Sequence, residues 1–244
     1  MIPSGALPNP TPRGGPPRAR PVEAGPCLPL SVADLRDLAR SQRPVRKARG
    51  QAVVHEGDPA ERLYVVNDGV VALYHALPDG RRQILDFLWK GDVIGVGDAD
   101  TYAYTAEALV ETRMCAFARP DLERVMRDYP GLGLRLARIG MEGLHRAFGH
   151  MTVLGRKTAA ERLASFLLDL SERQGRCGGR RNPVWVPMAA TDIADHLGLR
   201  IETVSRRMTA FIKGGLIRRA DSHRIELLDR ARLAEIAEGG EGEA

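Results

Sequence analysis

The pattern of apolar and polar positions divides the chain into three parts, and the first is a series of short apolar runs. The runs "LYVV", "VVALYHAL", "QILDFL" and "DVIGV" are rich in β-branched and aromatic residues, which favour strands. Turn sequences such as Asn67-Asp68-Gly69 and Pro78-Asp79-Gly80 separate them at short intervals. This pattern predicts an antiparallel sandwich or barrel between residues 45 and 117, within a domain that we place at residues 27–120.

The apolar spacing changes after Pro120 to steps of three and four residues, which predicts one long helix over residues 121–156. One row on this helix has a spacing close to that of a coiled-coil seam: Leu132, Leu136, Ile139, Gly143, Ala147, His150 and Val153. Glycine disfavours helices, so Gly140, Gly143 and Gly149 indicate a closely packed neighbour. We expect the row to face a second copy of the chain, and burial against the chain's own β-domain is the alternative.

Residues 157–235 have the order of a winged helix-turn-helix. A helix over about residues 158–173 and a strand at "VWVPM" precede two helices joined at Gly198, and "LIRRADSHRIELLD" predicts two short strands around a polar turn. Val204, Met208 and Phe211 share the inward face of the second of the paired helices. Four residues are left on its outward face: Glu202, Ser205, Arg206 and Thr209.

The outward face of this helix has the chemistry of DNA recognition, because the second helix of such a motif enters the major groove. Arg206 can donate two hydrogen bonds to O6 and N7 of a guanine, and Glu202, one turn earlier, can accept one from the N4 amine of a cytosine. Nearby threonines and basic residues are candidate phosphate contacts: Thr191, Arg200, Thr203, Arg207, Lys213, Arg218 and Arg219. The alternative is an ordinary helical hairpin with a solvated face.

Composition adds a modest basic charge. The 244 residues include 36 Lys and Arg against 31 Asp and Glu, which gives a net charge of +5 and a pI near 9.4. A polyanionic partner is compatible with this charge without being required by it. No apolar run approaches the roughly 18 residues that span a bilayer, and the N-terminus lacks the apolar core of a secretory signal. We therefore expect a cytoplasmic protein with no membrane partner.

The two ends of the chain are poor in large apolar residues. Residues 1–26 are rich in proline and glycine and predict a disordered tail, followed by a short helix that Ser31 caps. Residues 236–244 predict a frayed acidic tail. The folded part of the chain is therefore expected between these two ends.

The chain resembles the CRP/FNR family of bacterial transcription regulators, and within it the FixK-like branch. The resemblance covers about residues 27–233 and rests on "ERLYVVNDGVVALY", "LDFLWKGDVIGV", "GHMTVLGRKTAAERLASFLLDL" and above all "TDIADHLGLRIETVSRRM". It implies an α+β fold: a cyclic-nucleotide-binding-type β-roll, which is a jelly roll, then a dimerisation helix and a C-terminal winged helix-turn-helix. It also implies that Glu202, Ser205 and Arg206 read half-sites like TTGA, which are inverted in the operator of a homodimer.

The same resemblance implies a biological role. FixK-like regulators control low-oxygen respiration, nitrogen fixation or nitrogen-oxide metabolism, usually as activators, so double-stranded DNA and RNA polymerase are the expected partners. The turn from Leu77 to Arg82 and the winged domain are candidate polymerase contacts by analogy. Arg200 departs from the family, because it stands where Ser or Thr commonly caps the reading helix. We expect a DNA phosphate to bind at that helix N-terminus instead.

The sensor domain lacks the residues that the resemblance assigns to known effectors. Gly95-Val96 stands in place of a glycine-glutamate pair, and Tyr104-Thr105 in place of an arginine followed by Ser or Thr, so cyclic AMP is not expected. Cys27 and Cys115 match two ligands of the iron-sulfur branch, but its other N-terminal cysteines are missing. We therefore expect no cofactor and no metal.

Three further possibilities stay open on the sequence. A haem-dependent gas sensor of the same fold would take its iron ligand from His55, His75, His145 or His150. The spacing of these histidines does not match a specific haem-binding pattern. A jelly-roll metalloenzyme would need clustered histidines and a carboxylate, whereas His55 and His75 stand alone on separate strands, so no enzyme is expected. Cys177 has arginines at 176, 180 and 181 beside it and is a possible redox-sensitive thiol.

Overall fold

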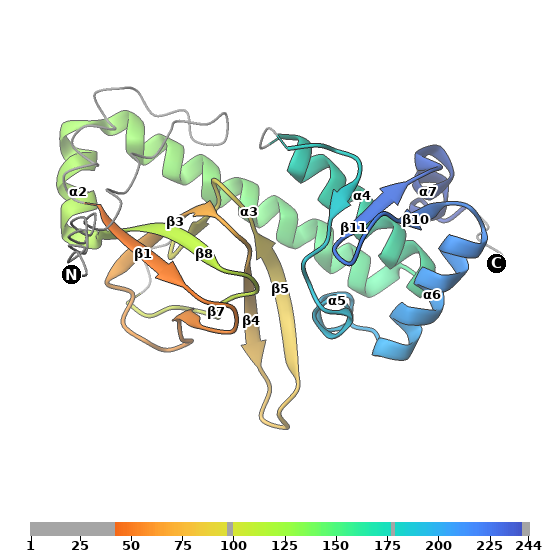
Figure 1. Cartoon of the computed structure of the whole chain (residues 1–244). Coiled ribbons are helices and arrows are strands. Elements are labelled where there is room, and N and C mark those ends of the chain that lie inside the picture. The colour runs from red at the N-terminus through yellow and green to blue at the C-terminus, as the bar shows by residue number, and fades with distance from the viewer. Residues whose placement is uncertain (1–41, 97–99, 177–178, 241–244) are drawn as a thin grey trace, which may run out of the picture.

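The computed structural model describes residues 42–96, 100–176 and 179–240. Figure 1 shows a β-domain at the N-terminal side, a long helix that runs behind it, and a smaller mixed domain at the C-terminal side. The predicted tail at residues 1–26, the helix expected near Ser31, Cys27 and Cys177 all lie outside the described residues.

The β-domain consists of two four-stranded antiparallel sheets, and the predicted fold class is confirmed. Its strands are β1 (Arg43–Lys47), β2 (Ala52–Val54), β3 (Arg62–Asp68), β4 (Val71–Ala76), β5 (Arg82–Leu88), β6 (Val93–Ile94), β7 (Thr105–Ala108) and β8 (Thr112–Ala118). One sheet has the order β1-β8-β3-β6 and the other β2-β7-β4-β5. A core of apolar side chains from both sheets fills the space between them, and Val66, Val71, Ile94 and Met114 are almost fully buried there.

The turn at Asn67-Asp68-Gly69 shows why the sequence places glycine at this point. Gly69 has φ of +101°, a conformation that L side chains rarely adopt, and a Cβ atom there would come within 2.7 Å of the Cα atom of Thr112. The turn joins β3 to β4, which belong to different sheets. Glycine therefore lets the chain cross from one sheet to the other in close contact with β8.

The expectation of one long helix over residues 121–156 is wrong, because two helices occupy this region. Helix α2 (Arg119–Asp128) ends before Tyr129, and α3 (Pro130–Arg156) begins at the proline. Proline has no amide hydrogen and disfavours helical geometry in the residue before it, and Tyr129 has φ −130° and ψ 80°. Pro130 therefore starts a second helix at its first turn, where a proline is tolerated.

The C-terminal domain combines four helices with a three-stranded sheet. Its elements are α4 (Ala159–Arg176), β9 (Val184–Trp185), α5 (Ala190–Leu197), α6 (Ile201–Lys213), β10 (Ile217–Arg219), β11 (Arg224–Leu227) and α7 (Arg230–Ala237). Thr158 and Glu161 form a reciprocal cap at the start of α4: the Thr158 hydroxyl accepts from the amide of Glu161, and the Glu161 carboxylate accepts from the amide of Thr158. The sheet has the order β10-β11-β9.

The acidic tail was expected to begin at residue 236, and this boundary is wrong. Residues 236 and 237 belong to α7, and both Ile236 and Ala237 are buried together with Leu233. Asp229 caps this helix by accepting a hydrogen bond of 2.8 Å from the amide of Arg232. The spacing of three apolar residues at i, i+3 and i+4 after an aspartate was the available signal for this helix.

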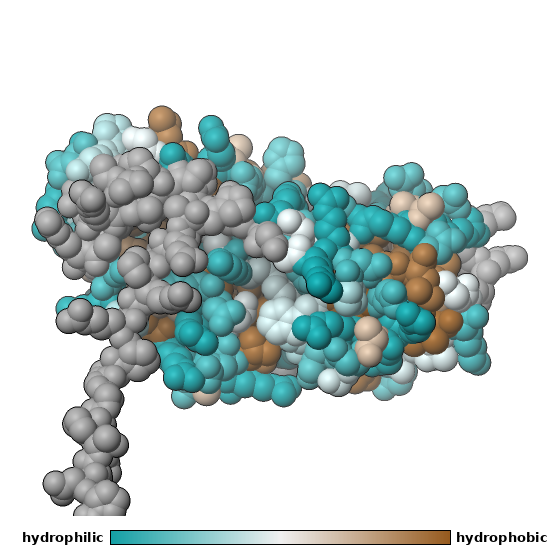
Figure 2. All heavy atoms as spheres, turned by 45° about the horizontal axis from the view of Figure 1, so that its top comes forward, coloured by the Kyte–Doolittle hydropathy of each residue, from teal (hydrophilic) through white to brown (hydrophobic). Residues whose placement is uncertain are grey.

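The C-terminal domain packs on β5, which is the edge strand of the β2-β7-β4-β5 sheet of the β-domain. Figure 1 shows α5 beside β5, and the apolar core of the C-terminal domain continues into Ile84 and Phe87 of that strand. Trp89, just after the strand, meets Trp185 of β9 in an edge-to-face contact with centroids 5.7 Å apart. Hydrophilic residues cover most of the face seen in Figure 2. No helix among the described residues is long and apolar enough to cross a membrane.

Candidate nucleic-acid interface

Helices α5 and α6 form the helix-turn-helix, and Gly198 makes the turn between them. Gly198 adopts the left-handed conformation with φ 60° and ψ 40°, and the amide of Leu199 donates back to the carbonyl oxygen of Ala194 at 3.0 Å. Val204, Met208 and Phe211 bury one side of α6 against the domain core. The inward face predicted from the apolar spacing is therefore the face that packs.

The opposite side of α6 carries the four residues predicted to point outward. Glu202, Ser205, Arg206 and Thr209 are all exposed, and we call this set the reading face. The Thr209 hydroxyl donates to the carbonyl oxygen of Ser205, four residues back along the helix, at 2.9 Å. Within the described residues no hydrogen bond or ion pair involves the side chains of Glu202 or Arg206, so both side chains are available to a partner that docks on α6.

The N-terminus of α6 has the arrangement expected from Arg200. Arg200 is the N-cap residue, and its side chain makes no capping hydrogen bond. Its carbonyl oxygen accepts from the amides of Thr203 and Val204 at 2.9 and 3.1 Å. No side chain caps the free amides of the first turn of α6, and the helix dipole is positive at this end. The first turn can therefore receive an anionic group.

The candidate phosphate contacts surround this helix at different depths. Thr191, Arg200, Lys213, Arg218 and Arg219 are exposed, whereas Thr203 and Arg207 are half-buried. Arg218 is bound to Glu226 across the β10–β11 hairpin, with Nε 3.0 Å and Nη2 2.5 Å from the carboxylate oxygen. A phosphate at this position would have to compete with Glu226, while Arg200 and Lys213 carry no such ion pair among the described residues.

Comparison with known proteins gives two family matches. Residues 44–129 match the model of the cyclic nucleotide-binding domain, and residues 161–236 match that of the Crp-like helix-turn-helix domain. The nitrogen fixation regulation protein FixK of Bradyrhizobium diazoefficiens is 39% identical over 212 residues, which cover 86% of this chain and 89% of that protein. The chain belongs to the CRP/FNR family.

Other CRP/FNR regulators show the same relationship. FixK of Rhizobium meliloti is 38% identical and covers 73% of this chain and 80% of its own length. The structure of FixK2 from Bradyrhizobium japonicum, at 33% identity, superposes with a TM-score of 0.75 and covers 80% of this chain and 96% of that one. The predicted family and the predicted function as a DNA-binding transcription regulator are confirmed, and these relatives are regulators, not enzymes.

The first part of the predicted dimer seam packs against the protomer's own β-roll, which is the alternative that the sequence left open, while contact of the remaining residues with a second copy stays a prediction. Leu132 is only 3% exposed and belongs to a core formed with β3 and β8, and Leu136 and Ile139 pack against the same core. Further along α3, Gly143, Ala147, His150 and Val153 line a partly open cavity of about 600 Å³, and Ala147 is exposed. The spacing identified an apolar row on a helix, but spacing does not tell which neighbour covers it.

A different row on α3 is exposed in the protomer. Its members share large apolar side chains with exposed fractions between 45% and 74%: Leu134, Met141, Leu144, Phe148 and Met151. From Met141 the steps are three, four and three residues, the spacing of a coiled-coil seam. We call this set the exposed apolar row. Apart from its chain neighbours and the backbone of its own helix, no atom of the described residues lies within 4 Å of the position that a Cβ atom of Gly149 would take, so the helix has room for a neighbour there.

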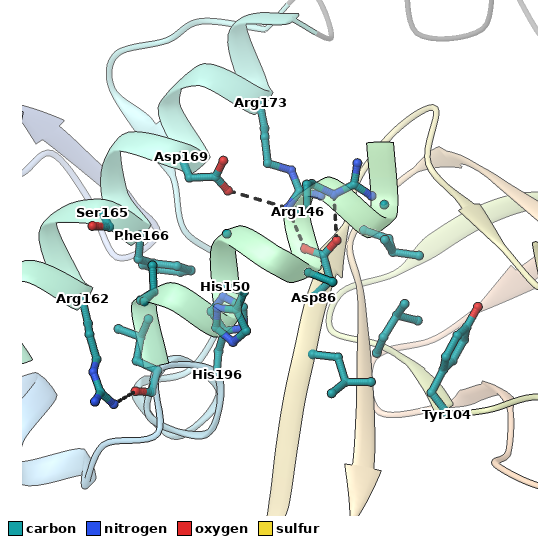
Figure 3. Close-up of a pocket in the computed structure, with 18 of the residues that line it drawn as sticks. Asp86, Tyr104, Arg146, His150, Arg162, Ser165, Phe166, Asp169, Arg173 and His196 are labelled. Carbon is teal, nitrogen blue, oxygen red and sulfur yellow. Dashed lines mark hydrogen bonds and ion pairs between the residues drawn. The ribbon is translucent and has the colours of Figure 1, made fainter. Parts of the chain in front are cut away.

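The cavity beside α3 shows whether a cyclic nucleotide fits this CRP/FNR member (Figure 3). At its apolar end Val96 and Tyr104 occupy the places where the resemblance would put a carboxylate and an arginine, beside Leu73, Leu85 and Leu88. The Tyr104 hydroxyl accepts a hydrogen bond of 3.0 Å from the Gly95 amide, and burial raises the pKa of Tyr104. Among the described residues no cation lines this end of the cavity, and the nearby Arg119 already donates to the Gly95 carbonyl oxygen at 3.1 Å, so the residues present do not fit a cyclic nucleotide.

The polar end of the cavity holds paired charges. Asp86 of β5 lies between two arginines: Arg146 of α3 at 3.1 Å and Arg173 of α4 at 2.7 Å. Figure 3 shows both guanidinium groups turned toward the Asp86 carboxylate. Burial opposes ionisation of Asp86, but the two arginines hold the pKa of its carboxyl below the usual value. These cations are therefore already neutralised within the protein.

The candidate metal and redox residues in the described part of the chain form no metal-binding group. Among the described residues, no group of three or more His, Cys, Asp or Glu side chains is arranged to hold a metal ion. Cys115 is buried in β8, its sulfur accepts from the side-chain amide (Nδ2) of Asn67 at 3.1 Å, and burial raises the pKa of its thiol. His75 pairs with Glu56 at 3.0 Å on the surface. Cys115 therefore has the surroundings of an inert core residue.

Three residues that hold the helix-turn-helix in place were not singled out from the sequence. Arg162 donates to three carbonyl oxygens, those of Leu154, Lys157 and Leu197, at 2.8 to 2.9 Å, and so ties the ends of α3 and α5 together. Arg82 binds Asp192, which also caps α5 by accepting from the amide of Ala189 at 2.8 Å. Of the three, only Asp192 had a local signal in the sequence: it is the third residue of a predicted helix, where an acidic side chain is favourable.

Proposed function

We propose that the protein is a homodimeric transcription activator that reads an inverted repeat of TTGA-like half-sites through the reading face of α6. The observation that carries this proposal is the joint exposure of Glu202, Ser205 and Arg206 on one side of a well-packed helix. Similar proteins are named for nitrogen fixation regulation and, in FnrL of Cereibacter sphaeroides, for transcriptional activation. The genes controlled would accordingly belong to nitrogen fixation or low-oxygen metabolism.

Each residue of the reading face has a distinct task in this proposal. The planar guanidinium of Arg206 binds O6 and N7 of a guanine, and the Glu202 carboxylate accepts from the N4 amine of a cytosine. Ser205, between them, can donate or accept. Glu202 is repelled by phosphate unless a cytosine amine meets it, so it selects against other sequences as well as contacting one base.

Phosphate contacts would hold the protein in register on the duplex. Arg200 and Lys213 lie exposed at the two ends of α6, and Thr191 is exposed on α5. Thr203, Arg207 and Arg218 complete the set of candidates, Arg218 after release from Glu226. The uncapped N-terminus of α6 would take one phosphate through its first amides.

The second copy of the chain would bind along the exposed apolar row of α3. CRP/FNR regulators bind DNA and function as dimers, and five large apolar side chains with seam-like spacing would otherwise stay in contact with water. A two-fold axis along this helix would present two copies of α6 to two inverted half-sites. RNA polymerase is the further partner we propose, with the exposed turn around Leu77, Asp79 and Arg81 as one contact.

The test is a binding titration of the full chain against duplexes that carry the inverted TTGA repeat, a single half-site or a scrambled sequence. Arg206→Ala should weaken binding by about 1 to 3 kcal/mol per half-site and remove discrimination at one base pair. Arg46→Ala, an exposed arginine of the β-roll, is the control. Equal binding by wild-type protein and Arg206→Ala would remove the base-reading role, and equal binding to single and inverted sites would remove the dimer.

A further inference from the structure

The β-roll and the helix-turn-helix are joined by a row of polar contacts between β5 and α5. Arg82, at the start of β5, donates to Asp195 at 2.8 Å and also binds Asp192. One residue on, the Gln83 side chain donates to the carbonyl oxygen of His196 at 3.2 Å. The Nδ1 atom of His196 lies 3.1 Å from the carbonyl oxygen of Ile84. The edge strand thus holds α5 near its start, its middle and its end.

Arg82 is itself held from both sides. Its guanidinium lies 5.5 Å from the ring centroid of Tyr74 on the neighbouring strand β4, and its side chain is 27% exposed. The side chains of Asp192 and Asp195 are 10% and 32% exposed. An ion pair that is partly shielded from water and shared between two carboxylates has a more definite geometry than an exposed pair of surface charges.

The position of α5 determines the position of α6. The two helices share one core through Ile193, Leu197, Val204 and Met208, and only Gly198, Leu199 and Arg200 connect them. Any rotation of α5 on β5 therefore turns the reading face with it. The hydrogen bonds and ion pairs of Arg82, Gln83 and Ile84 described above all go to α5, so α5 links the edge strand to this pair of helices.

The contact at Arg82 leaves the reading face uncovered. Asp192 and Asp195 lie on the side of α5 that meets β5, whereas Glu202, Ser205 and Arg206 are exposed on α6. A contact that inhibited DNA binding would have to cover these side chains or bury them. The geometry therefore fits a device that orients the reading face rather than one that hides it.

A second anchor keeps the domains together without Arg82. Arg173 of α4 donates to Asp86 at 2.7 Å and to the carbonyl oxygen of Phe87 at 2.6 Å, and Phe166 of α4 packs on Phe87 with centroids 6.0 Å apart. The loss of Arg82 would therefore free the angle of α5 without separating the two domains.

We propose that Arg82 is a positioning residue for DNA recognition: bound to Asp192 and Asp195, it fixes the angle of the helix-turn-helix and so the half-site spacing that the dimer accepts. This inference rests on the proposed binding to an inverted repeat. A change of one base pair between half-sites moves them by about 3.4 Å and rotates them by roughly a tenth of a turn, so a rigid pair of reading helices distinguishes such operators.

The experiment measures binding of the full-length protein to three duplexes with identical half-sites: the best gap for the wild type, and gaps one base pair shorter and longer. The quantity compared is the ratio of affinity for the best gap to affinity for the altered gaps. Arg82→Ala should lower this ratio by about fivefold, mostly through weaker binding to the best gap. Arg82→Lys, which keeps the charge but cannot span both carboxylates, should lower it less.

Asp195→Asn separates orientation from general electrostatics. This variant removes a negative charge, whereas Arg82→Ala removes a positive one, so a simple charge effect would move DNA affinity in opposite directions. Positioning predicts that both variants lower the gap ratio and that the double variant is no worse than Arg82→Ala alone. Asp195→Asn keeps the side-chain shape, so its ratio decides the matter if Arg82→Ala fails to fold.

Arg46→Ala is the matched control, because Arg46 is an exposed arginine of the β-roll whose side chain binds Glu111 of the same domain. Its gap ratio should equal that of the wild type. An Arg82→Ala protein with uniformly weaker binding and an unchanged gap ratio would overturn the proposal, and so would one that binds the best gap more tightly. Failure of the wild-type protein to prefer an inverted repeat would instead refute the proposed function, and this is seen without any variant.

Discussion

The reading face of α6 and strand β5, on which the C-terminal domain docks, both carry charged side chains, but only those on β5 are paired within the described structure. We call β5 and its partners in the C-terminal domain the docking side. On β5 each of Arg82 and Asp86 is bound to residues of the C-terminal domain at hydrogen-bond distance. On α6, Glu202 and Arg206 are exposed and have no such partner among the described residues. Charges that are paired inside the chain fix its geometry, while charges left unpaired on a rigid helix can bind something else.

The largest effect expected from this difference concerns Arg173 on the docking side. Its burial opposes a positive charge, yet Asp86, Asp92 and Asp169 raise the pKa of the guanidinium above its usual value. Arg173→Ala would leave the partly shielded carboxylates of Asp86 and Asp92 with too little compensating charge and should cost about 3 to 5 kcal/mol of unfolding free energy. Urea unfolding of Arg173→Ala and Arg206→Ala measures the contrast.

The matched change on the reading face should alter stability by less than about 0.5 kcal/mol, because Arg206 is exposed. Arg173→Met combined with Asp86→Asn serves as a further control, since removing both charges avoids leaving the Asp86 carboxylate with Arg146 as its remaining cation. Similar stabilities of Arg173→Ala and Arg206→Ala would show that the docking charges do not hold the domains together, and the comparison would fail.

The fold and the reading face were predictable because their signals are local. Strand-forming runs, the turn at Gly198 and the buried positions Val204, Met208 and Phe211 all lie within a few residues of one another. A break at Pro130 was visible in the sequence, but proline is tolerated in the first turn of a helix and does not by itself say whether one helix ends there.

The docking contacts were not predictable because their partners are far apart in the sequence. Arg82 and Asp192 are separated by 110 positions, and Arg173 and Asp86 by 87. A lone arginine on a strand has no local pattern that names its carboxylate. The neighbour that covers the start of α3 was not predictable for the same reason: Leu132 and Leu134 are both apolar, and only the tertiary structure buries the first and exposes the second.

A pH dependence should come from the docking side. Burial, helped by the stacked ring of His150 at 4.1 Å and opposed by Asp86, lowers the pKa of His196 to about 4. In the unfolded chain this histidine takes up its proton near pH 6.5, so its contribution to stability is complete above that pH. The contribution is lost as the pH falls from about 6.5 to 4 and amounts to about 3 kcal/mol at most.

His196→Gln isolates this contribution, because the surrounding groups Asp86, His150, Asp169 and Arg173 stay in place. Urea unfolding of both proteins at several pH values between 7.5 and 4.5 should show wild-type stability falling more steeply on acidification. Parallel curves for the two proteins would mean that the neutral His196 is not a requirement of the docking contact.

The smallest effect is expected from Glu202, and it bears on selectivity instead of stability. Glu202→Ala removes a negative charge from a surface that meets phosphates, which strengthens binding to any duplex, and it also removes the hydrogen bond to one cytosine amine. These two changes oppose each other on the correct site, so total affinity there should change by less than about 1 kcal/mol. On a site with the cytosine replaced, only the gain remains, and discrimination at that base pair should fall by about 1 to 3 kcal/mol.

Titration of wild type and Glu202→Ala against both duplexes measures this loss of discrimination, with Thr209→Ala as a control on the same exposed face. If Glu202→Ala kept its discrimination at every base pair, the only acidic residue on the reading face would have no part in reading DNA, and unpaired charge on α6 would be a poor guide to which residues recognise bases.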